Sequence, residues 1–273
     1  MKKLLGLVFS IVLSVMSLSA ANEPDGDVST YLVGEYMTPK DVKAKLSEAG
    51  FEVITTFKSI KKGKTVIFTC PTLKKEASKS GRAHVATMRA FADEKNQVLS
   101  ITNPVYFGKA YMQKDYDHAK FSAVKAKIES AFTNLKGSED KMEFDDLAGF
   151  HFMMGMPYYE DTKVVGEGSN AELITKLKEY KKGKNLVFEL EIDKDTTLVG
   201  YKIGRGTERF AKKIGRANAG LLPWVIVVEN DKASILQAEY YIALTYPQLG
   251  MGQFAGIASI PGDVIKDLKK PFK

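Results

Sequence analysis

The chain has a single cysteine, Cys70, among its 273 residues. One thiol cannot form an internal disulfide, so the fold must be held together by its hydrophobic core. Cys70 ends an apolar run and precedes Pro71, where a buried, unreactive thiol is the expected state. The Cys70-Pro71 pair also occurs in thiolate haem ligands, but a single dipeptide of this kind is a weak signal, and a proline at the start of a helix explains it.

Histidine is scarce too, with three residues, so there is little general-base capacity apart from the carboxylates. The sequence contains no serine or cysteine in a turn of the nucleophile-elbow type. No spacing of carboxylates supports a hydrolytic site either. We therefore predict no catalytic residue, and an enzyme is the less favoured of the possible functions.

A long apolar run is lacking beyond the N-terminus. Lys2 and Lys3 precede an apolar stretch, Leu4 to Met16, and small residues follow up to Ala21. This order is typical of a secretory signal peptide over residues 1–21, and the run is shorter than the roughly 20 residues of a membrane-spanning helix. The sequence thus predicts a secreted, periplasmic protein with no integral membrane segment after cleavage.

The formal charge is +7, but the basic residues are spread along the chain. A nucleic-acid ligand would favour a concentrated basic stripe with interleaved aromatic residues. The sequence lacks one, so we expect no nucleic-acid partner and a solvated, lysine-rich surface. Small clusters occur at Lys61-Lys62-Lys64, Lys74-Lys75, Lys181-Lys182-Lys184 and Lys212-Lys213.

Two parts of the chain resemble each other at a spacing of 134 residues. Gly81-Arg82-Ala83-His84 recurs as Gly215-Arg216-Ala217-Asn218, and at the same spacing Ser100 matches Ser234 and Tyr106 matches Tyr240. This period is about the size of a small domain. We predict two tandem repeats, residues 28–136 and 140–273, separated by the polar turn Gly137–Asp140.

Hydrophobic periodicity predicts the same α+β pattern in both repeats, with a mainly antiparallel sheet packed against helices. Thr38-Pro39 and Asn103-Pro104 have the composition of helix starts. The other expected helices begin at Pro71 or cover 121–135, 170–180, a segment around Phe210, and 264–268. The expected strands are 51–57, 65–70, 83–92, 97–102, 186–192, 197–202, 221–228 and 233–240.

Several of these segments resemble the bacterial "domain of unknown function 302" family. The first repeat supplies Cys70-Pro71-Thr72-Leu73 and Val98–Pro104, and the second supplies Leu222-Pro223-Trp224 and the strand that follows. Trp224 stands where the family often has a cysteine, and Met88-Arg89 replaces Leu-Pro in the first repeat. The resemblance implies a small α+β domain that tends to pair, hence a pseudo-dimer within one chain. It brings no catalytic residue.

One segment has the composition of a soft-metal site. His151, Met153, Met154 and Met156 follow one another within six residues, and thioether and imidazole ligands suit copper(I). An extended strand would place at most two of them on one side, and adaptable core filling by methionine is the alternative. A copper- or haem-handling protein is therefore our second hypothesis.

Arginine recurs at the same place in both repeats. Arg82 and Arg216 could face each other across a pseudo-twofold axis and bind an acidic ligand, or could be paired with acids. We expect a cleft between the repeats, lined by the segment Phe150–Tyr159, which includes Tyr158, and by the hairpin around Trp224 and Tyr240. The leading interpretation is a secreted, non-enzymatic binding protein for a small molecule or a protein partner.

Overall fold

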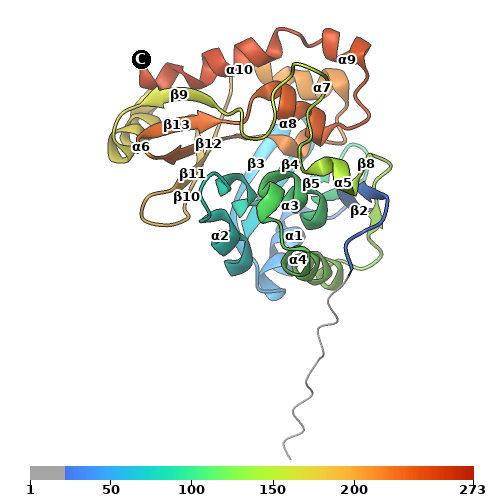
Figure 1. Cartoon of the computed structure of the whole chain (residues 1–273). Helices are drawn as coiled ribbons and strands as arrows, with labels where there is room; N and C mark the ends of the chain where they lie inside the picture. The colour runs from blue at the N-terminus through green and yellow to red at the C-terminus, as the bar shows by residue number, and fades with distance from the viewer. Residues whose placement is uncertain (1–21) are drawn as a thin grey trace, which may run out of the picture.

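The computed structural model describes residues 22–273, and the predicted signal peptide, residues 1–21, lies outside the described residues. The fold is α+β, as predicted, with two antiparallel sheets packed against helices (Figure 1). We call residues 27–147 the first unit, residues 163–273 the second unit, and residues 148–162 the connecting segment.

The first unit contains a six-stranded antiparallel sheet. Its strand order is β3 (Glu52–Ile60), β4 (Gly63–Thr69), β5 (Met88–Asp93), β6 (Val98–Thr102), β2 (Tyr31–Glu35) and β7 (Lys136–Gly137). A two-stranded ladder of β1 (Asp27–Ser29) and β8 (Lys141–Glu143) adjoins it. The helices of this unit are α1 (Pro39–Glu48), α2 (Pro71–Ala77), α3 (Pro104–Met112), α4 (His118–Ala131) and α5 (Phe144–Leu147), with the 3-10 turns η1 (Ala83–Ala86) and η2 (Gln113–Asp115).

The second unit contains a five-stranded antiparallel sheet. Its order is β10 (Leu186–Glu191), β11 (Thr197–Tyr201), β12 (Trp224–Glu229), β13 (Lys232–Ile235) and β9 (Lys163–Glu167). Its helices are α6 (Asn170–Glu179), α7 (Phe210–Ile214), α8 (Ala238–Thr245), α9 (Met251–Ala255) and α10 (Ile260–Leu268). The 3-10 turns are η3 (Tyr180–Gly183), η4 (Thr207–Arg209), η5 (Ala219–Leu221) and η6 (Lys270–Phe272).

The two sheets follow the same path. In each, a first strand leads through a helix to the far edge of the sheet, and the chain then returns strand by strand until the last strand pairs with the first. The helix that follows, α3 or α8, lies at the boundary between the units (Figure 1). Strands β1, β2, β7, β8 and β9 were not anticipated from the sequence. Residues 83–86 form a 3-10 turn where a strand was expected, and the strand expected over 233–240 gives way to α8 at Ala238.

Local signals explain several helix starts. Thr38 accepts a hydrogen bond from the backbone N–H of Asp41, and Asn103 accepts one from Val105, with proline at the first helical position in both cases. These caps satisfy backbone donors that have no partner within the helix. The helix starts predicted at Thr38-Pro39 and Asn103-Pro104 are therefore confirmed.

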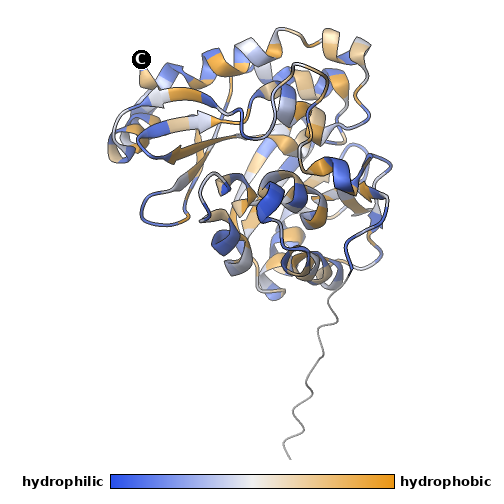
Figure 2. Cartoon of the chain, in the orientation of Figure 1, coloured by the Kyte–Doolittle hydropathy of each residue, from blue (hydrophilic) through white to orange (hydrophobic). Residues whose placement is uncertain are grey.

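A single hydrophobic core runs through both units and across the boundary between them. The strands and inner helices carry most of the apolar residues, while the loop joining β10 and β11 is mainly hydrophilic (Figure 2). Cys70 is a free, buried thiol within this core. No helix among residues 22–273 combines the length and the apolar composition that crossing a membrane would require.

The chain stays with the first unit beyond the predicted boundary. Strand β8 pairs with β1, and α5 packs against α3. The composition placed the boundary at Gly137–Asp140 because those residues are polar and turn-forming. In the structure they instead form the end of β7 and a loop, with Ser138 accepting a hydrogen bond from the backbone N–H of Tyr31 at 3.1 Å.

Candidate functional site

The two units meet through reciprocal contacts of their 3-10 turns. Turn η1 of the first unit packs on β11 and β12, and turn η5 of the second unit packs on β3, β4 and β5. At Gly220 in η5 a Cβ atom would lie 2.8 Å from the Cβ of Phe91. Glycine therefore permits the close approach of this turn to the opposite sheet. We call the boundary between the units the seam.

A buried arginine crosses the seam. Arg89 on β5 is 6 % exposed and donates hydrogen bonds to the carbonyl oxygens of Gly220 at 3.1 Å and Pro223 at 3.0 Å, and also to that of Leu221. Its donors are thus satisfied by carbonyl oxygens, and it forms no ion pair among the described residues. Because carbonyl oxygens carry only partial charges, the seam keeps a net positive charge at this point.

Two cavities lie beside one another in the seam. The smaller, of about 30 Å³, is lined in part by Arg89, Thr87 and Trp224, and it has room for about one water molecule. The larger, of about 210 Å³, has volume for roughly seven water-sized groups. His84 lines both cavities, and the larger one is also lined by Arg82, Tyr159, Glu160, Glu229 and Ser234.

His84 is an imidazole without a hydrogen-bond partner at Nε2 among the described residues. Burial, with the nearby Arg89 cation acting in the same direction, lowers its pKa to about 3. The ring packs against Tyr111 and Tyr159, with centroids 6.1 and 6.2 Å apart. His84 is therefore neutral at neutral pH and presents an unused nitrogen to the seam.

Glu229 is the last residue of β12 and lines the larger cavity. Burial raises the pKa of its carboxyl and the nearby Asp193 raises it further, while the backbone N–H of Gly81 lowers it by a hydrogen bond. Among residues 22–273 Glu229 takes part in no ion pair within 4 Å. A partly buried carboxylate without a cationic partner is costly to keep ionised.

The equivalent strand end in the first unit shows what Glu229 lacks. Asp93 is the last residue of β5, and Arg216 of the second unit binds it with two hydrogen bonds, of 2.6 and 2.8 Å. Burial alone would raise the pKa of Asp93, but Arg216 and the backbone N–H groups of Lys95 and Asn96 lower it overall. The Glu229 carboxyl borders a cavity, whereas the Asp93 carboxyl is bound by the Arg216 guanidinium.

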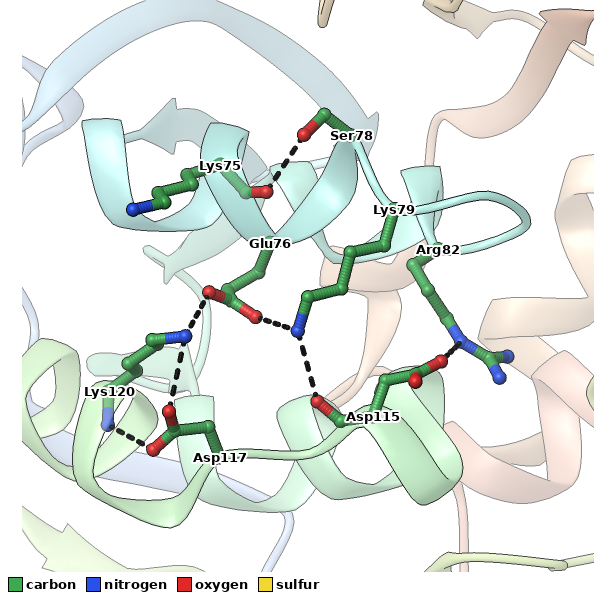
Figure 3. A network of polar contacts seen from close by, with 8 residues as sticks. All are labelled: Lys75, Glu76, Ser78, Lys79, Arg82, Asp115, Asp117 and Lys120. Carbon is green, nitrogen blue, oxygen red and sulfur yellow. Dashed lines mark hydrogen bonds and ion pairs between the residues drawn. The ribbon is translucent and has the colours of Figure 1, made fainter.

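Arg82 lies at the cavity but is held by other acids. Its Nε donates to Asp115 at 3.0 Å and its Nη1 to Glu160 at 3.2 Å, and its guanidinium lies 5.4 Å from the centre of the Tyr159 ring. Figure 3 shows the Arg82–Asp115 contact at the edge of a larger polar network. Arg82 is thus fixed and largely neutralised before any ligand arrives.

The network that holds Arg82 centres on a buried carboxylate. Glu76 is 1 % exposed and binds the ammonium groups of Lys79 and Lys120, each at 2.6 Å (Figure 3). Burial would raise the pKa of Glu76, but its hydrogen bonds to Lys120 and Lys79 lower it overall. Lys79 also donates to the carbonyl oxygen of Asp115 at 3.3 Å, which links the Glu76 cluster to the partner of Arg82.

The other residues expected to bind a ligand do not share one site, and they range from fully buried to exposed. Arg216 and Arg82 do not bind a common partner, and the structure matches the alternative in which each is paired with acids. Trp224 is 1 % exposed and borders the smaller cavity, and Tyr240 is fully buried. Tyr158 is 45 % exposed. Its neighbour Tyr159, which the sequence did not single out, enters the seam and donates to the Gly81 carbonyl at 2.8 Å.

The residues proposed for a metal site lie on the connecting segment. Met154 is 93 % exposed and Met153 is 37 % exposed, while Met156 packs against the core. The His151 ring lies 4.5 Å from the ring of Tyr158. Separately, the described residues contain no group of three or more histidine, cysteine, aspartate and glutamate side chains that could hold a metal ion.

The sequence alone does not bring His84 and Glu229 together. His84 differs from its counterpart Asn218, which fits either a site kept in one repeat or a polar turn residue, and Glu229 stands at a strand end where glutamate is usually solvated. Comparison of the chain with protein-family models, curated proteins and solved structures found no match. The resemblance to the domain of unknown function 302 family therefore stays a prediction.

Proposed function

We propose that this is a secreted, non-enzymatic binding protein that holds a small ligand in the larger seam cavity. The proposal places it in the periplasm, after removal of residues 1–21. The observation that carries it is the contrast between two strand ends. Asp93 is neutralised by Arg216 from the opposite unit, whereas Glu229 borders a cavity and has no cation within ion-pair distance among residues 22–273.

The cavity favours a ligand that donates hydrogen bonds. When it is ionised, the Glu229 carboxylate accepts hydrogen bonds and donates none. The unused Nε2 of neutral His84 is also a hydrogen-bond acceptor in the tautomer that carries its proton on Nδ1. A small molecule bearing a guanidinium or ammonium group would supply the charge that Arg216 supplies to Asp93, and would relieve the cost of the buried carboxylate.

We propose further that the two units arose by duplication and that one seam site then diverged. Support comes from the common strand order and from the reciprocal packing of η1 and η5. By the 134-residue spacing, His84 corresponds to Asn218, whose side-chain amide donates to the Asp140 carboxylate and to the Thr245 carbonyl, both at 2.7 Å. The position is therefore satisfied within the fold in the second unit, whereas His84 borders a cavity and leaves Nε2 without a partner among the described residues.

The first experiment is native mass spectrometry of the mature protein, purified without a metal-affinity tag. A retained small organic mass would support the proposal. Titration calorimetry with agmatine, arginine and putrescine then tests the ligand class. We expect Glu229→Gln to weaken binding at least tenfold, because the charge-assisted hydrogen bond is lost. Glu167→Gln, on the exposed end of β9, is the matched control and should bind as the unmodified protein does.

Two results would overturn this proposal. One is the absence of any heat of binding with all three amines at millimolar concentration. The other is equal binding by the Glu229→Gln and unmodified proteins, because the ligand would then lie elsewhere.

A further inference from the structure

Three lysine clusters that are far apart in the sequence come together on one face of the molecule. The clusters at residues 61–62, 181–184 and 212 all border depressions along the edge strand β3. Strand β3 is the edge of the first sheet and β10 is the edge of the second, and these two strands lie beside each other. The sequence indicated a dispersed charge because it does not show that the two units place these edges together.

Two adjoining depressions form what we call the basic groove. The first, of about 590 Å³, is lined by six basic side chains, from Lys61, Lys62, Lys95, Arg209, Lys212 and Arg216. The second, of about 1000 Å³, is lined by five more, from Lys58, Lys181, Lys184, Lys202 and Arg205. The two depressions meet at Glu208 and along consecutive residues of β3.

Most of this positive charge is not neutralised within the described part of the chain. Of the basic residues that line the groove, only Lys62 and Arg216 form ion pairs among residues 22–273, with Glu94 and Asp93. Glu208 is the one acidic residue in the lining. Burial raises its pKa, although Arg205, Lys202 and Arg209 act in the opposite direction. A surface of this kind attracts a ligand with several negative charges.

The other side chains of the groove indicate which class of polyanion fits it best. Phe57 is the only aromatic residue in its lining and is 7 % exposed, so stacking of nucleic-acid bases has no platform there. The exposed large hydrophobic residues lie outside the groove, which leaves no side chain to insert into a membrane. Thr55 and Asn185 offer neutral hydrogen-bonding groups suited to hydroxyls.

We infer that the basic groove binds a linear polysaccharide that carries sulfate or phosphate groups. Its charged groups would contact the lysines and arginines of both units, and its hydroxyls would contact the neutral polar residues on β3 and beside β10. This site is separate from the seam cavity, because none of the residues that line the groove lines that cavity. Binding of a polysaccharide would thus survive a failure of the proposed small-ligand function.

The test uses the mature protein and a heparin-derived decasaccharide as the probe, with affinity measured by titration calorimetry. We expect binding that weakens about tenfold or more between 50 and 200 mM salt, as for other sites that displace counterions. The triple variant Lys181→Glu, Lys184→Glu, Arg205→Glu should lose at least a further tenfold in affinity. The triple variant Lys43→Glu, Lys232→Glu, Lys266→Glu changes the net charge equally at exposed sites outside the groove.

Three outcomes would overturn the inference. The first is no binding of the decasaccharide at 50 mM salt. The second is an equal loss of affinity in the two triple variants, since net charge rather than the groove would then determine binding. The third is tighter binding of single-stranded DNA than of the decasaccharide at equal charge, which would assign the groove to a different polymer. Circular dichroism of each variant confirms that it is folded before it is compared.

Discussion

Tyr106 and Tyr240 make the same hydrogen bond in opposite directions across the seam. The hydroxyl of Tyr106 donates to the carbonyl oxygen of Leu244 at 2.8 Å, and the hydroxyl of Tyr240 donates to that of Ala110 at 3.2 Å. The two tyrosines are 134 residues apart, and so are the two acceptors. Contacts of this reciprocal kind are characteristic of twofold interfaces. The two hydrogen bonds therefore make the contact between the units reciprocal, as the proposed duplication would require.

The two tyrosine hydroxyls are nevertheless expected to contribute differently to the free energy of unfolding. Both are fully buried, but the Ala110 carbonyl also accepts from the side chain of Gln113, whereas the Leu244 carbonyl has no other donor among the described residues. We expect Tyr106→Phe to lower the free energy of unfolding by about 1–3 kcal/mol, because it leaves a buried acceptor unsatisfied. Tyr240→Phe should cost about 1 kcal/mol or less. Urea unfolding measures both, and a larger cost for Tyr240→Phe would contradict the assignment.

The Arg216–Asp93 pair joins the units by charge. Asp93 is 2 % exposed and accepts hydrogen bonds from Nε and Nη2 of Arg216. Asp93→Asn should destabilise the protein by about 2 kcal/mol at pH 7, because Arg216 loses its carboxylate partner and keeps only its hydrogen bonds to the carbonyl oxygens of Lys61 and Lys62.

This pair also predicts an acid dependence. The folded-state pKa of Asp93 is depressed, so its stabilising effect is present above the unfolded value of about 3.9 and is lost as pH falls through the folded value. Below about pH 4 the unmodified protein should therefore lose stability more steeply than Asp93→Asn. Urea unfolding at a series of pH values tests this, and parallel curves would show that Asp93 is not ionised in the fold.

Elements with local signals could be predicted from the sequence. The helix starts at Thr38-Pro39 and Asn103-Pro104 depend on a capping side chain and an adjacent proline, which are properties of neighbouring residues. The α+β class followed from periodicity in the same way. These predictions succeeded because the interactions concerned span only a few residues.

The first strand of each large sheet was missed although a signal was available. Strand β2 ends in Val33-Gly34-Glu35 and β9 ends in Val165-Gly166-Glu167, and both are five residues long. Each glycine is in close contact with a side chain that comes late in the sequence of the same unit. A Cβ on Gly34 would be 2.9 Å from Leu135, and one on Gly166 would be 2.5 Å from Phe272. The shared tripeptide identifies these strands, whereas a short strand alone gives little periodicity.

The candidate site could not be predicted, because its properties arise from contacts between distant segments. Arg82 and Arg216 were correctly marked as equivalent in sequence, but the choice between ligand and acid partners depends on Asp115, Glu160 and Asp93. The pKa of Glu229 is raised by burial and by Asp193, and the cavity that it borders is lined by residues of both units. No pattern within the chain records which of two equivalent carboxylates will have an arginine beside it.

His84 gives a second acid-dependent prediction. Its folded-state pKa of about 3 lies below the unfolded value of about 6.5. Between these two values the unfolded chain binds a proton that the folded chain does not, so stability is lost as pH falls through this window. We expect the free energy of unfolding of the unmodified protein to fall by up to about 1.4 kcal/mol per pH unit more than that of His84→Gln.

The measurement for His84 is urea unfolding of both proteins at pH 7, 6, 5 and 4. Because His84→Gln leaves the Asp93–Arg216 pair in place, the difference between the two curves isolates the imidazole. Identical slopes would show that His84 accepts a proton within the folded seam, which its burial and the neighbouring Arg89 oppose.

The copper hypothesis is best tested on the connecting segment. Met153 and Met156 belong to one turn, in which the Met156 N–H donates to the Met153 carbonyl at 2.9 Å. With Met154 almost fully exposed, a copper(I) site here would form at the surface, using soft thioether and imidazole ligands. The double variant His151→Ala, Met154→Ala should then bind copper(I) at least tenfold more weakly in a competition assay under reducing conditions.

Met251→Ala is the matched control for that variant, since Met251 is also exposed, at 58 %, but lies on α9. A copper site on the connecting segment requires that this control keep the affinity of the unmodified protein. If the double variant and the control both bind as the unmodified protein does, the segment holds no copper. Met153 and Met154 would then be ordinary surface residues of the segment. The segment is held against α9 by the contact between Phe152 and Phe254, whose ring centroids lie 4.9 Å apart.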